Sequence, residues 1–296
     1  MSDRIKWRFT PPCGGRPSHP APDPLEAAFQ STPPVWGATL NIKQVTKRLR
    51  MNWDEQATPL IDKYRFSKWM NGAGLVTAES ADLTKANIVE KIMDGTAAMS
   101  NKLVPLTNRT LFIRESVYIK VKLATEIVGI DKLGAKSVGN GVVGELDGMK
   151  IVRVPDVYFP AGVNFFIKYK NATVDPMKLK TLRVHKNPMG IDGDVAECRF
   201  MHDAFVIGTK VNGLYVDVAA ANVQATPTIA KSSSTWTITS SGATAIKYTT
   251  DGTDPKTSST AQTYSDALSG LASGTVIKAY ATKTGALNSG VAEFTV

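Results

Sequence analysis

The stretch Gly139–Val216 decides the fold and reads GNGVVGELDGMKIVRVPDVYFPAGVNFFIKYKNATVDPMKLKTLRVHKNPMGIDGDVAECRFMHDAFVIGTKVNGLYV. Short apolar and β-branched runs alternate in it with Gly, Pro, Asn and Asp, which favour turns. The predicted strands are Ile151–Val154, Phe165–Tyr169, Leu182–Val184, Ala196–Met201 and Phe205–Gly208. No nucleophile has a base at a familiar spacing, and no phosphate-cradling loop is present. The pattern predicts a compact mixed sheet in a protein with a structural role.

Length and hydropathy limit the class of protein further. At 296 residues the chain is long enough for more than one domain. No apolar run approaches the roughly 20 residues that span a bilayer. The N-terminal residues also lack the apolar core of a secretory signal. We therefore expect no membrane contact and synthesis in a cytoplasm.

The net charge of +9 suits contact with nucleic acid or another polyanion. The basic residues are scattered, however, and their only tight group is Lys43, Lys47, Arg48 and Arg50. A solvated helix face explains this group more readily than a DNA-reading site does. The sequence thus predicts nonspecific proximity to nucleic acid without base recognition.

Composition divides the chain into three regions. Positions 1–37 contain about half of the 16 prolines, a density typical of segments that do not pack, so we expect this region to be disordered. Positions 38–224 carry regular apolar periodicities and form the predicted core region. Positions 225–296 are rich in Ser and Thr, and the change in composition marks a domain boundary.

The core region opens with a predicted amphipathic helix. Its apolar face is formed by Ile42, Val45, Leu49, Trp53, Ala57, Leu60 and Tyr64, at steps of three and four. Pro59 is expected to kink or interrupt the helix, because it lacks a backbone donor and crowds the preceding turn. The helical spacing of Trp53, Tyr64, Phe66 and Trp69 favours core packing over a ligand cage.

A second helix is predicted from Thr84 to Lys102, with Asp82 as its N-cap. Ile88, Ile92 and Met99 would face the core. Further along, Thr110–Ile113 is predicted to be a buried strand. Glu115–Leu123 fits a short helix or a strand equally well.

The C-terminal region alternates in hydropathy over 235–239, 245–249 and 275–281, with turn residues between these runs. Disorder is the alternative for a region so rich in Ser and Thr. The residues that could form a core are Trp236, Ile246, Tyr248, Val276, Ile277, Tyr280 and Phe294. The sequence therefore predicts a small antiparallel sandwich.

Four groups of residues invite a functional interpretation, and each has a simpler explanation. Cys198, His202 and His185 fall short of a zinc site, because the remaining Cys13 lies in the Pro-rich segment. The run Asp251-Gly252-Thr253-Asp254 lacks the spaced acids of a calcium loop and fits a turn. The glycines Gly139, Gly141, Gly144 and Gly148 lack the setting of a nucleotide loop, and the carboxylates Glu145, Asp147 and Asp156 lack that of a glycosidase pair. We predict no catalytic, cofactor or metal site, and no enzyme.

Four segments taken together carry a family resemblance: VPLTNRTLFIRESVY, VGELDGMKIVRVPDVYFP, FFIKYKNATVDPMKLKTLRV and DVAECRFMHDAFVIGTKVNGLYV. In order and spacing they resemble tailed-bacteriophage major capsid proteins of the Hong Kong 97-type fold, over about Ala38 to Val218. The Leu40–Trp69 stretch, with DEQATPLIDKYRF, looks like the end of that family's spine helix. The resemblance implies an α+β fold with a spine helix and mixed sheets, divided into peripheral and axial domains.

The same resemblance implies a function. The chain would be a structural protein of a virion, from a phage or prophage, that assembles in the host bacterial cytoplasm. Its partners would be copies of itself in hexamers and pentamers around the genome, together with scaffold, portal or decoration proteins. The family's N-terminal arm and long hairpin loop have no counterpart before Ala38, so this chain looks N-terminally incomplete. Without the lysine of that loop, we predict no Lys–Asn cross-link between subunits.

The C-terminal region has a resemblance of its own. YTTDGTDPKTSSTAQTYSDAL and LASGTVIKAYATKTGALNSGVAEF are similar to the immunoglobulin-like modules at the C-termini of chitobiase-type glycosidases. On a capsid protein such a domain would project outward, as decoration or as a weak carbohydrate contact. Two alternatives stay open: a carbohydrate-binding module on a non-catalytic or degraded enzyme, and a bacterial nanocompartment shell protein.

Overall fold

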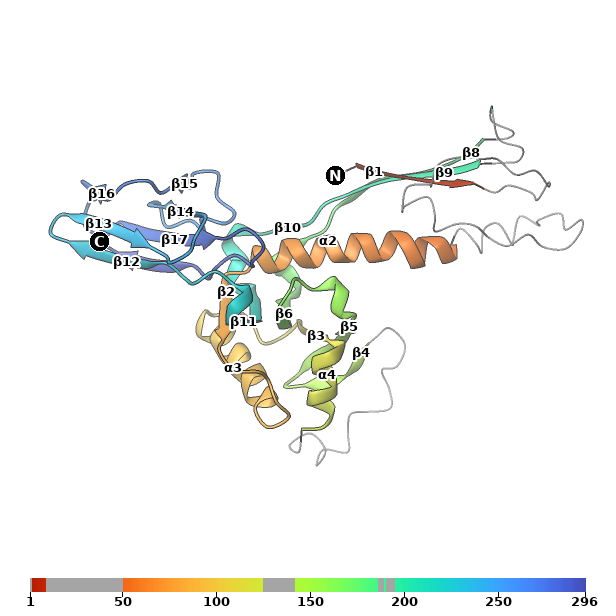
Figure 1. Ribbon diagram of the computed structural model, residues 1–296, viewed down its shortest axis with the longest axis horizontal. Helices are drawn as coiled ribbons and strands as arrows, with labels where there is room; N and C mark the ends of the chain where they lie inside the picture. Colours follow the sequence, from red (N-terminus) through yellow and green to blue (C-terminus); the bar gives the residue numbers. More distant parts are fainter. Residues whose placement is uncertain (1, 9–49, 125–141, 186–188, 190–194) are drawn as a thin grey trace, which may run out of the picture. The chain divides into compact units, whose positions relative to one another are not determined.

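The computed structural model describes residues 2–8, 50–124, 142–185, 189 and 195–296 (Figure 1). By its internal contacts the chain divides into two compact units. The first comprises Met1–Ile61 and Asp175–Asp203, and the second comprises Asp62–Val174 and Ala204–Val296. The division falls inside helix α2 (Thr58–Asn71), so one helix contributes residues to both units.

The first unit contains a three-stranded antiparallel sheet. Its strands are β1 (Ser2–Arg8), β9 (Val195–His202) and β8 (Met177–His185), in that order across the sheet. The predicted strands at Leu182–Val184 and Ala196–Met201 are confirmed within longer ones. The expectation of disorder is wrong for Ser2–Arg8, because pairing of this segment with β9 satisfies its backbone groups. The remainder of positions 1–37 lies outside the described residues.

Pro59 lies within a continuous helix, and the helix is distorted one turn before it. Residues 50–52 are helical, Trp53–Ala57 form a π-helical turn, and α2 follows directly. The Thr58 amide bonds the Trp53 carbonyl, one residue beyond the usual α-helical partner. The extra residue in this turn shifts the apolar face. Ile61 is therefore buried with Ala57, and the prediction that Leu60 faces the core is wrong.

The second unit is built on a six-stranded mixed sheet. Its strands, in spatial order, are β2 (Leu75–Glu79), β11 (Leu214–Ala219), β6 (Val163–Tyr169), β3 (Arg109–Arg114), β5 (Met149–Val154) and β4 (Val142–Leu146). The pairs β2–β11 and β3–β5 are parallel, and the other pairs are antiparallel. The mixed sheet predicted from the sequence is thus confirmed. Asp147 and Gly148, both at positive φ, close the turn between β4 and β5.

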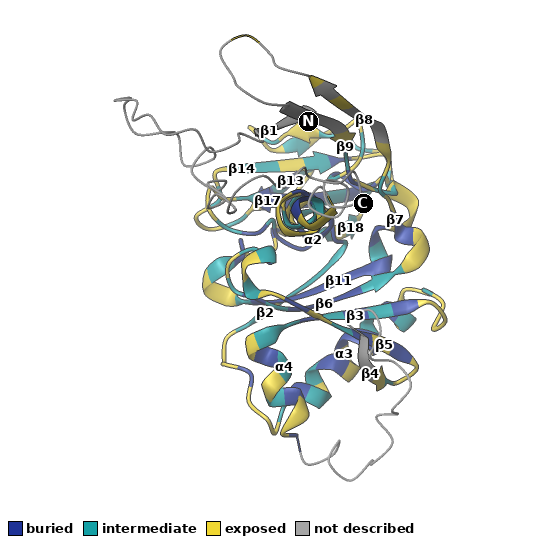
Figure 2. Ribbon diagram, turned by 90° about the vertical axis from the view of Figure 1, so that its right-hand side faces the viewer, coloured by how far each residue is buried: buried dark blue, intermediate teal, exposed yellow. Residues whose placement is uncertain are grey.

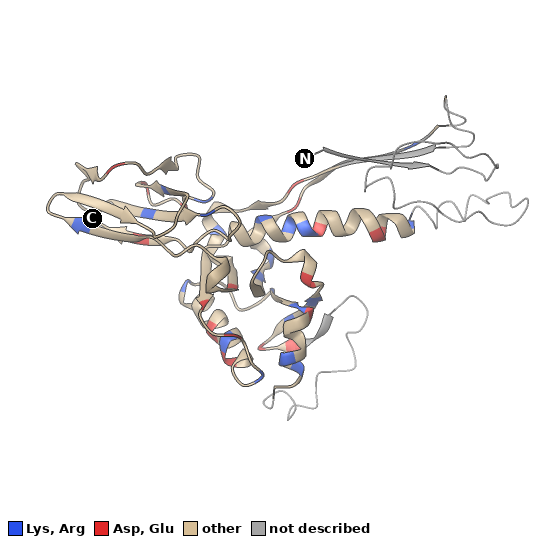
Figure 3. Ribbon diagram, viewed as in Figure 1, with Lys and Arg blue, Asp and Glu red and all other residues tan. Residues whose placement is uncertain are grey.

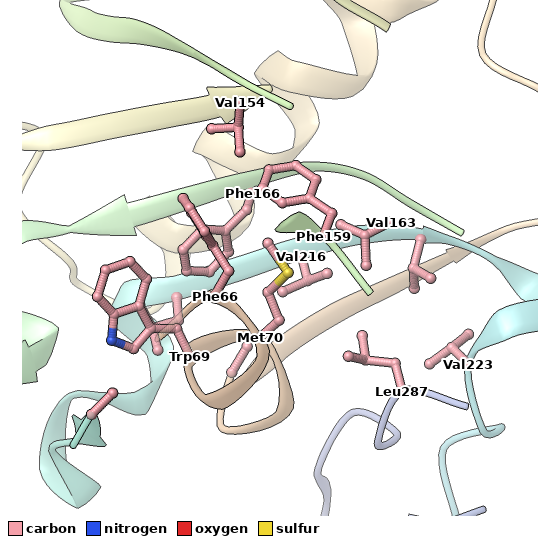
Figure 4. Packing of buried hydrophobic residues seen from close by; sticks show 14 of the residues in the cluster. Phe66, Trp69, Met70, Val154, Phe159, Val163, Phe166, Val216, Val223 and Leu287 are labelled. Atoms are coloured by element: carbon pink, nitrogen blue, oxygen red, sulfur yellow. The ribbon is translucent and has the colours of Figure 1, made fainter. Parts of the chain in front are cut away.

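Helices cover both faces of this sheet, and the strands between them are the most buried (Figure 2). One face carries α3 (Ile88–Asn101) and α4 (Glu115–Lys122), packed on Leu111, Ile151 and Phe165. The other face carries the part of α2 that belongs to this unit, through Phe66, Trp69 and Met70 (Figure 4). The prediction that Phe66 and Trp69 are core residues is confirmed.

The predictions for α3 and α4 are confirmed in part. Ile88, Ile92 and Met99 are fully buried, as predicted. The predicted start at Thr84 with Asp82 as N-cap is wrong, because α3 begins at Ile88. The Asn87 side chain there accepts hydrogen bonds from the Thr84 amide and hydroxyl, so the chain turns before the helix starts. The open choice at Glu115–Leu123 resolves as a helix.

Short elements connect the main ones. They are η3 (Asp156–Tyr158), η4 (Lys170–Ala172), β7 (Thr173–Val174), β10 (Phe205–Val206), η5 (Gly208–Gly213) and η6 (Ala220–Asn222). β7 and β10 pair antiparallel. The strand predicted over Phe205–Gly208 is shorter than expected, because the chain turns into a 3₁₀-helix at Gly208.

Residues 225–296 form a two-sheet antiparallel sandwich, as predicted, which we call the C-terminal sandwich. One sheet has β12 (Thr228–Ser232), β13 (Thr235–Thr239) and β16 (Leu268–Ser269); the other has β15 (Gln262–Thr263), β14 (Ala245–Thr249), β17 (Val276–Thr282) and β18 (Ala292–Thr295). Trp236 and Ile277 lie in the core between the sheets. Val276 and Tyr280 do not, because alternation along β17 places them on the opposite face.

Candidate functional site

The cysteine and histidines that suggested a metal site are kept apart by strand register. In the β8–β9 ladder His202 pairs with Met177 at one end, and His185 pairs with Val195 at the other. Cys198 pairs with Leu182 between them. At about 3.3 Å per residue the two histidines are separated by most of the strand length. In the part of the chain that the structure describes, no group of three or more His, Cys, Asp or Glu side chains could hold a metal ion.

In the acidic turn of the C-terminal sandwich, neighbouring residues supply the hydrogen bonds that the Asp251 carboxylate accepts. Asp251 accepts hydrogen bonds from the amide and hydroxyl of Thr253 and from the hydroxyl of Thr260. These bonds lower the pKa of Asp251 to about 2. The turn borders a hollow of about 110 Å³ whose other lining residues include Tyr248 and Gln262. The Tyr248 hydroxyl bonds Gln262, so the polar groups of this hollow largely pair with one another.

The glycines and carboxylates of the sheet also have structural roles. Gly144 lies within β4 and Gly148 in the turn after it, while Gly139 and Gly141 lie outside the described residues. Asp156 accepts a hydrogen bond from the Ser116 amide at the start of α4, and its carboxylate lies 3.8 Å from Arg114. Burial opposes ionisation there, but these hydrogen bonds and the charge of Arg114 leave the pKa of Asp156 below its ordinary value.

Helix α4 and the residue that caps its C-terminal end, Leu123, carry apolar side chains on two sides. Val117 and Val121 are buried against the sheet. Ile119 and Leu123, one turn apart on the outer side, are 55% and 59% exposed. We call these two residues the α4 apolar face. The connection from α3 to β3 also exposes Leu103 and Leu106. Exposed large apolar side chains are typical of surfaces that another molecule covers.

The charged residues of the described helices do not form a single basic face. Each of α2, α3 and α4 carries both basic and acidic residues (Figure 3). Two ion pairs illustrate the mixture: Arg153 bonds Glu115 at 2.9 Å, and Lys91 bonds Glu79 at 3.1 Å. Of the predicted basic group, Arg50 alone lies among the described residues, and it is exposed on a helix. Lys43, Lys47 and Arg48 lie outside the described residues, so the interpretation of the group as a solvated helix face stays a prediction.

Two buried polar residues escaped the sequence analysis. Arg109 donates hydrogen bonds to the carbonyls of Thr96, Val104 and Pro105, at the C-terminal end of α3. Asp217 is fully buried in β11 and accepts one hydrogen bond, from Asn164 at 2.7 Å. Its second oxygen has no hydrogen-bond partner. Burial, reinforced by the charge of Glu79, raises the pKa of Asp217 to about 6.

In the part of the chain that the structure describes, no helix is both long and apolar enough to cross a bilayer.

Comparisons with known proteins bear on the two halves of the chain differently. The family described as "Fn3 associated" matches residues 236–296, most of the C-terminal sandwich. Among curated proteins no sequence matches. Among solved structures, one from Mycobacterium phage Che8 is 12% identical with a TM-score of 0.49, over 73% of this chain and 70% of that one.

Two further solved structures are similar over 74% of this chain. The capsid structure of the cyanophage P-SCSP1u is 12% identical with a TM-score of 0.46, over 83% of its chain. The mature capsid of bacteriophage PhiM1 is 15% identical with a TM-score of 0.44, over 82% of its chain. With TM-scores below 0.5, these similarities alone do not assign the fold.

Proposed function

We propose that this chain is a structural subunit of a viral shell, the major capsid protein of a tailed phage or prophage. Copies of it assemble into hexamers and pentamers around the genome in the host cytoplasm and remain in the virion. Residues 38–224 form the capsid core, and the C-terminal sandwich projects as an immunoglobulin-like decoration domain.

The order of the elements supports this proposal. The four sequence segments that resemble phage capsid proteins coincide with β3–α4, with β4–β5–η3, with β6–β7–β8 and with β9–β10–β11. They therefore contain five of the six strands of the central sheet, all except β2. The same segments also contain β8 and β9 of the three-stranded sheet and the β7–β10 pair. This agreement between pattern and topology is what a shared architecture predicts.

The observation that carries self-assembly is the α4 apolar face. A helix that only covers a sheet needs one apolar stripe, and Val117 and Val121 provide it. Ile119 and Leu123 add a second stripe, which points away from the sheet and costs solubility unless another surface covers it. In a shell built from many copies, a small contact of this kind is repeated at every subunit boundary.

Sedimentation velocity of the full-length chain tests the proposal. We expect the wild type to sediment as complexes of five or six copies or larger. The double variant Ile119→Lys/Leu123→Lys should sediment as a monomer with an unchanged circular dichroism spectrum. Lys122→Gln is the matched control, since Lys122 is equally exposed on α4, and it should assemble like the wild type. A wild type that stays monomeric at every concentration would contradict the proposal.

Other partners belong to the proposal through the sequence resemblance. They are scaffold, portal and decoration proteins, and DNA met without base recognition, which the net charge of +9 suits. A weak carbohydrate contact through the C-terminal sandwich stays a prediction. Because the polar groups around its hollow bond one another, a sugar would have to displace the Tyr248–Gln262 hydrogen bond to enter.

A further inference from the structure

The chain bends sharply where α2 ends and β2 begins, and we call residues Asn71–Gly74 the α2–β2 corner. The C-terminal sandwich bonds this corner across a sequence separation of about two hundred residues. Lys256 donates from Nζ to the Ala73 carbonyl at 2.6 Å. Asn288 donates from its amide to Asn71 Oδ1 at 3.3 Å and from its side chain to the Asn71 carbonyl at 3.4 Å.

These donors meet a site that favours them. The last carbonyls of a helix have no intrahelical partner and carry the negative end of the helix dipole. Asn71 is the last residue of α2, and Ala73 follows it fully buried. Lys256 thus brings a cation to the C-terminal end of the helix. Its amino group lies 5.8 Å from the centre of the Tyr280 ring, on the face of β17 that points away from the sandwich core.

An apolar contact accompanies the polar ones. Leu287, from the connection between β17 and β18, is 3% exposed and belongs to the core cluster of the central sheet (Figure 4). It lies beside Val223, with which it forms a parallel β-bridge. The backbone on either side is tied as well: the Leu287 amide bonds the Asn222 carbonyl at 2.8 Å, and the Gln224 amide bonds the Leu287 carbonyl at 3.0 Å.

The connection into the sandwich is fixed rather than free. Gln224 is buried and donates from Nε2 to the Ser240 hydroxyl and the Ser241 carbonyl. Two glycines allow the backbones to approach closely. A Cβ at Gly208 would lie 2.8 Å from Thr257 Oγ1, and one at Gly290 would lie 3.0 Å from Thr226 Oγ1. Together these contacts leave no slack segment between the sheet and the sandwich.

We infer that the C-terminal sandwich is a clamp on the α2–β2 corner: an integral part of the folded subunit that holds the end of α2, rather than an appendage on a hinge. On the side of the central sheet, the contact surface consists of the α2–β2 corner, Val223 and Gly208. On the side of the sandwich, it consists of the two loops that carry Lys256 and Leu287. The inference goes beyond the proposed shell role and does not depend on it. One consequence is that the hollow beside Asp251 keeps a constant orientation relative to the central sheet.

Hydrogen exchange in the full-length chain tests the clamp. Lys256→Met removes the donor but keeps the length of the side chain, and Leu287→Ala removes the apolar anchor. At the amides of residues 72–76 and 223–224, we expect exchange to accelerate by about tenfold for Lys256→Met and by about thirtyfold for Leu287→Ala. Lys247→Met is the control, because Lys247 is exposed on β14, and it should leave these rates unchanged.

Hydrogen exchange at the amides of β13, the strand that carries the buried Trp236, reports whether the sandwich itself stays folded in each variant. The clamp is supported if exchange accelerates at the corner while this signal is unchanged. Unchanged exchange at 72–76 in both variants would overturn the inference, as would equal acceleration in Lys247→Met. If Leu287→Ala unfolds the sandwich, the milder Lys256→Met decides the outcome alone. None of these results depends on whether the chain assembles.

Discussion

Replacing Asp217 by Asn should change the pH dependence of stability more than any other single substitution in the sheet. Asp217 is a fully buried carboxyl group on β11, the strand between β2 and β6. Its surroundings are the Asn164 amide, which bonds it, and the Glu79–Lys91 ion pair contributed by β2 and α3. Burial is the largest cause that raises its pKa from 3.8 to about 6.

The sign of the effect follows from linkage. Because the pKa is higher in the folded state, the folded protein binds this proton more tightly than the unfolded chain does. The stabilisation by the proton is complete below about pH 4 and is lost as the pH rises through about 6. A shift of about two units corresponds to about 3 kcal/mol between the ends of this window.

The side chain of the Asp217→Asn variant would carry no charge at any pH. Its NH₂ group would be buried without a hydrogen-bond partner, at the position where the Asp217 Oδ2 atom has none. That amide costs about 1–2 kcal/mol. We therefore expect Asp217→Asn to be more stable than the wild type by about 1–2 kcal/mol at pH 7.5 and less stable by a similar amount at pH 4. The difference between the two proteins should change by about 3 kcal/mol over this range, whatever the amide costs.

The assay is urea unfolding of both proteins followed by circular dichroism, at half-unit steps from pH 4 to 7.5. Glu145→Gln, in an exposed position on β4, is the control, and its difference from the wild type should stay within about 0.5 kcal/mol throughout. A difference for Asp217→Asn that does not vary with pH would refute the reasoning. So would a variant that loses stability at pH 7.5, because it would show that Lys91 stabilises an ionised Asp217.

Two further substitutions probe the packing of α3. Gly95→Ala should destabilise the protein by about 1–3 kcal/mol in urea unfolding despite the better helix propensity of Ala, because the added Cβ would lie 2.7 Å from the Tyr215 ring; a gain in stability would contradict this packing. Arg109→Lys should cost about 2–4 kcal/mol in the same assay, because a single ammonium cannot reach all of the carbonyls that the guanidinium bonds; a loss below about 0.5 kcal/mol would show that they find other donors.

Local patterns are sufficient to predict several of the strands and the sandwich. The alternation over 235–239 and 245–249 coincides with β13 and β14 residue for residue, because a half-buried strand must alternate. Alternation cannot tell which face of a strand meets the core, however. For that reason Val276 and Tyr280 of β17 lie outside the sandwich core, although Tyr280 is buried on the other face. The π-helical turn before Pro59 escapes prediction for a related reason, since a shift of one residue leaves the apolar composition unchanged.

Long-range contacts leave weaker traces in the sequence. Asp217 interrupts the apolar run of LYVDVA at a position in phase with Tyr215, so the pattern contains a signal for a buried acid once β11 is known to be central. Lys256 offers no such signal. Its acceptor is a backbone carbonyl of Ala73, and only the folded chain brings the two together. For the same reason the segment around Val223 resembles an exposed linker in sequence and is in fact buried.

Cryo-electron microscopy of the purified full-length chain tests the central claim most directly. If the chain is a shell subunit, particle images should contain rings of five or six copies or closed shells. The α4 apolar face should then lie at the boundary between neighbouring copies, with Ile119 and Leu123 buried there. Single copies alone, or rings in which both side chains stay exposed to solvent, would contradict the account.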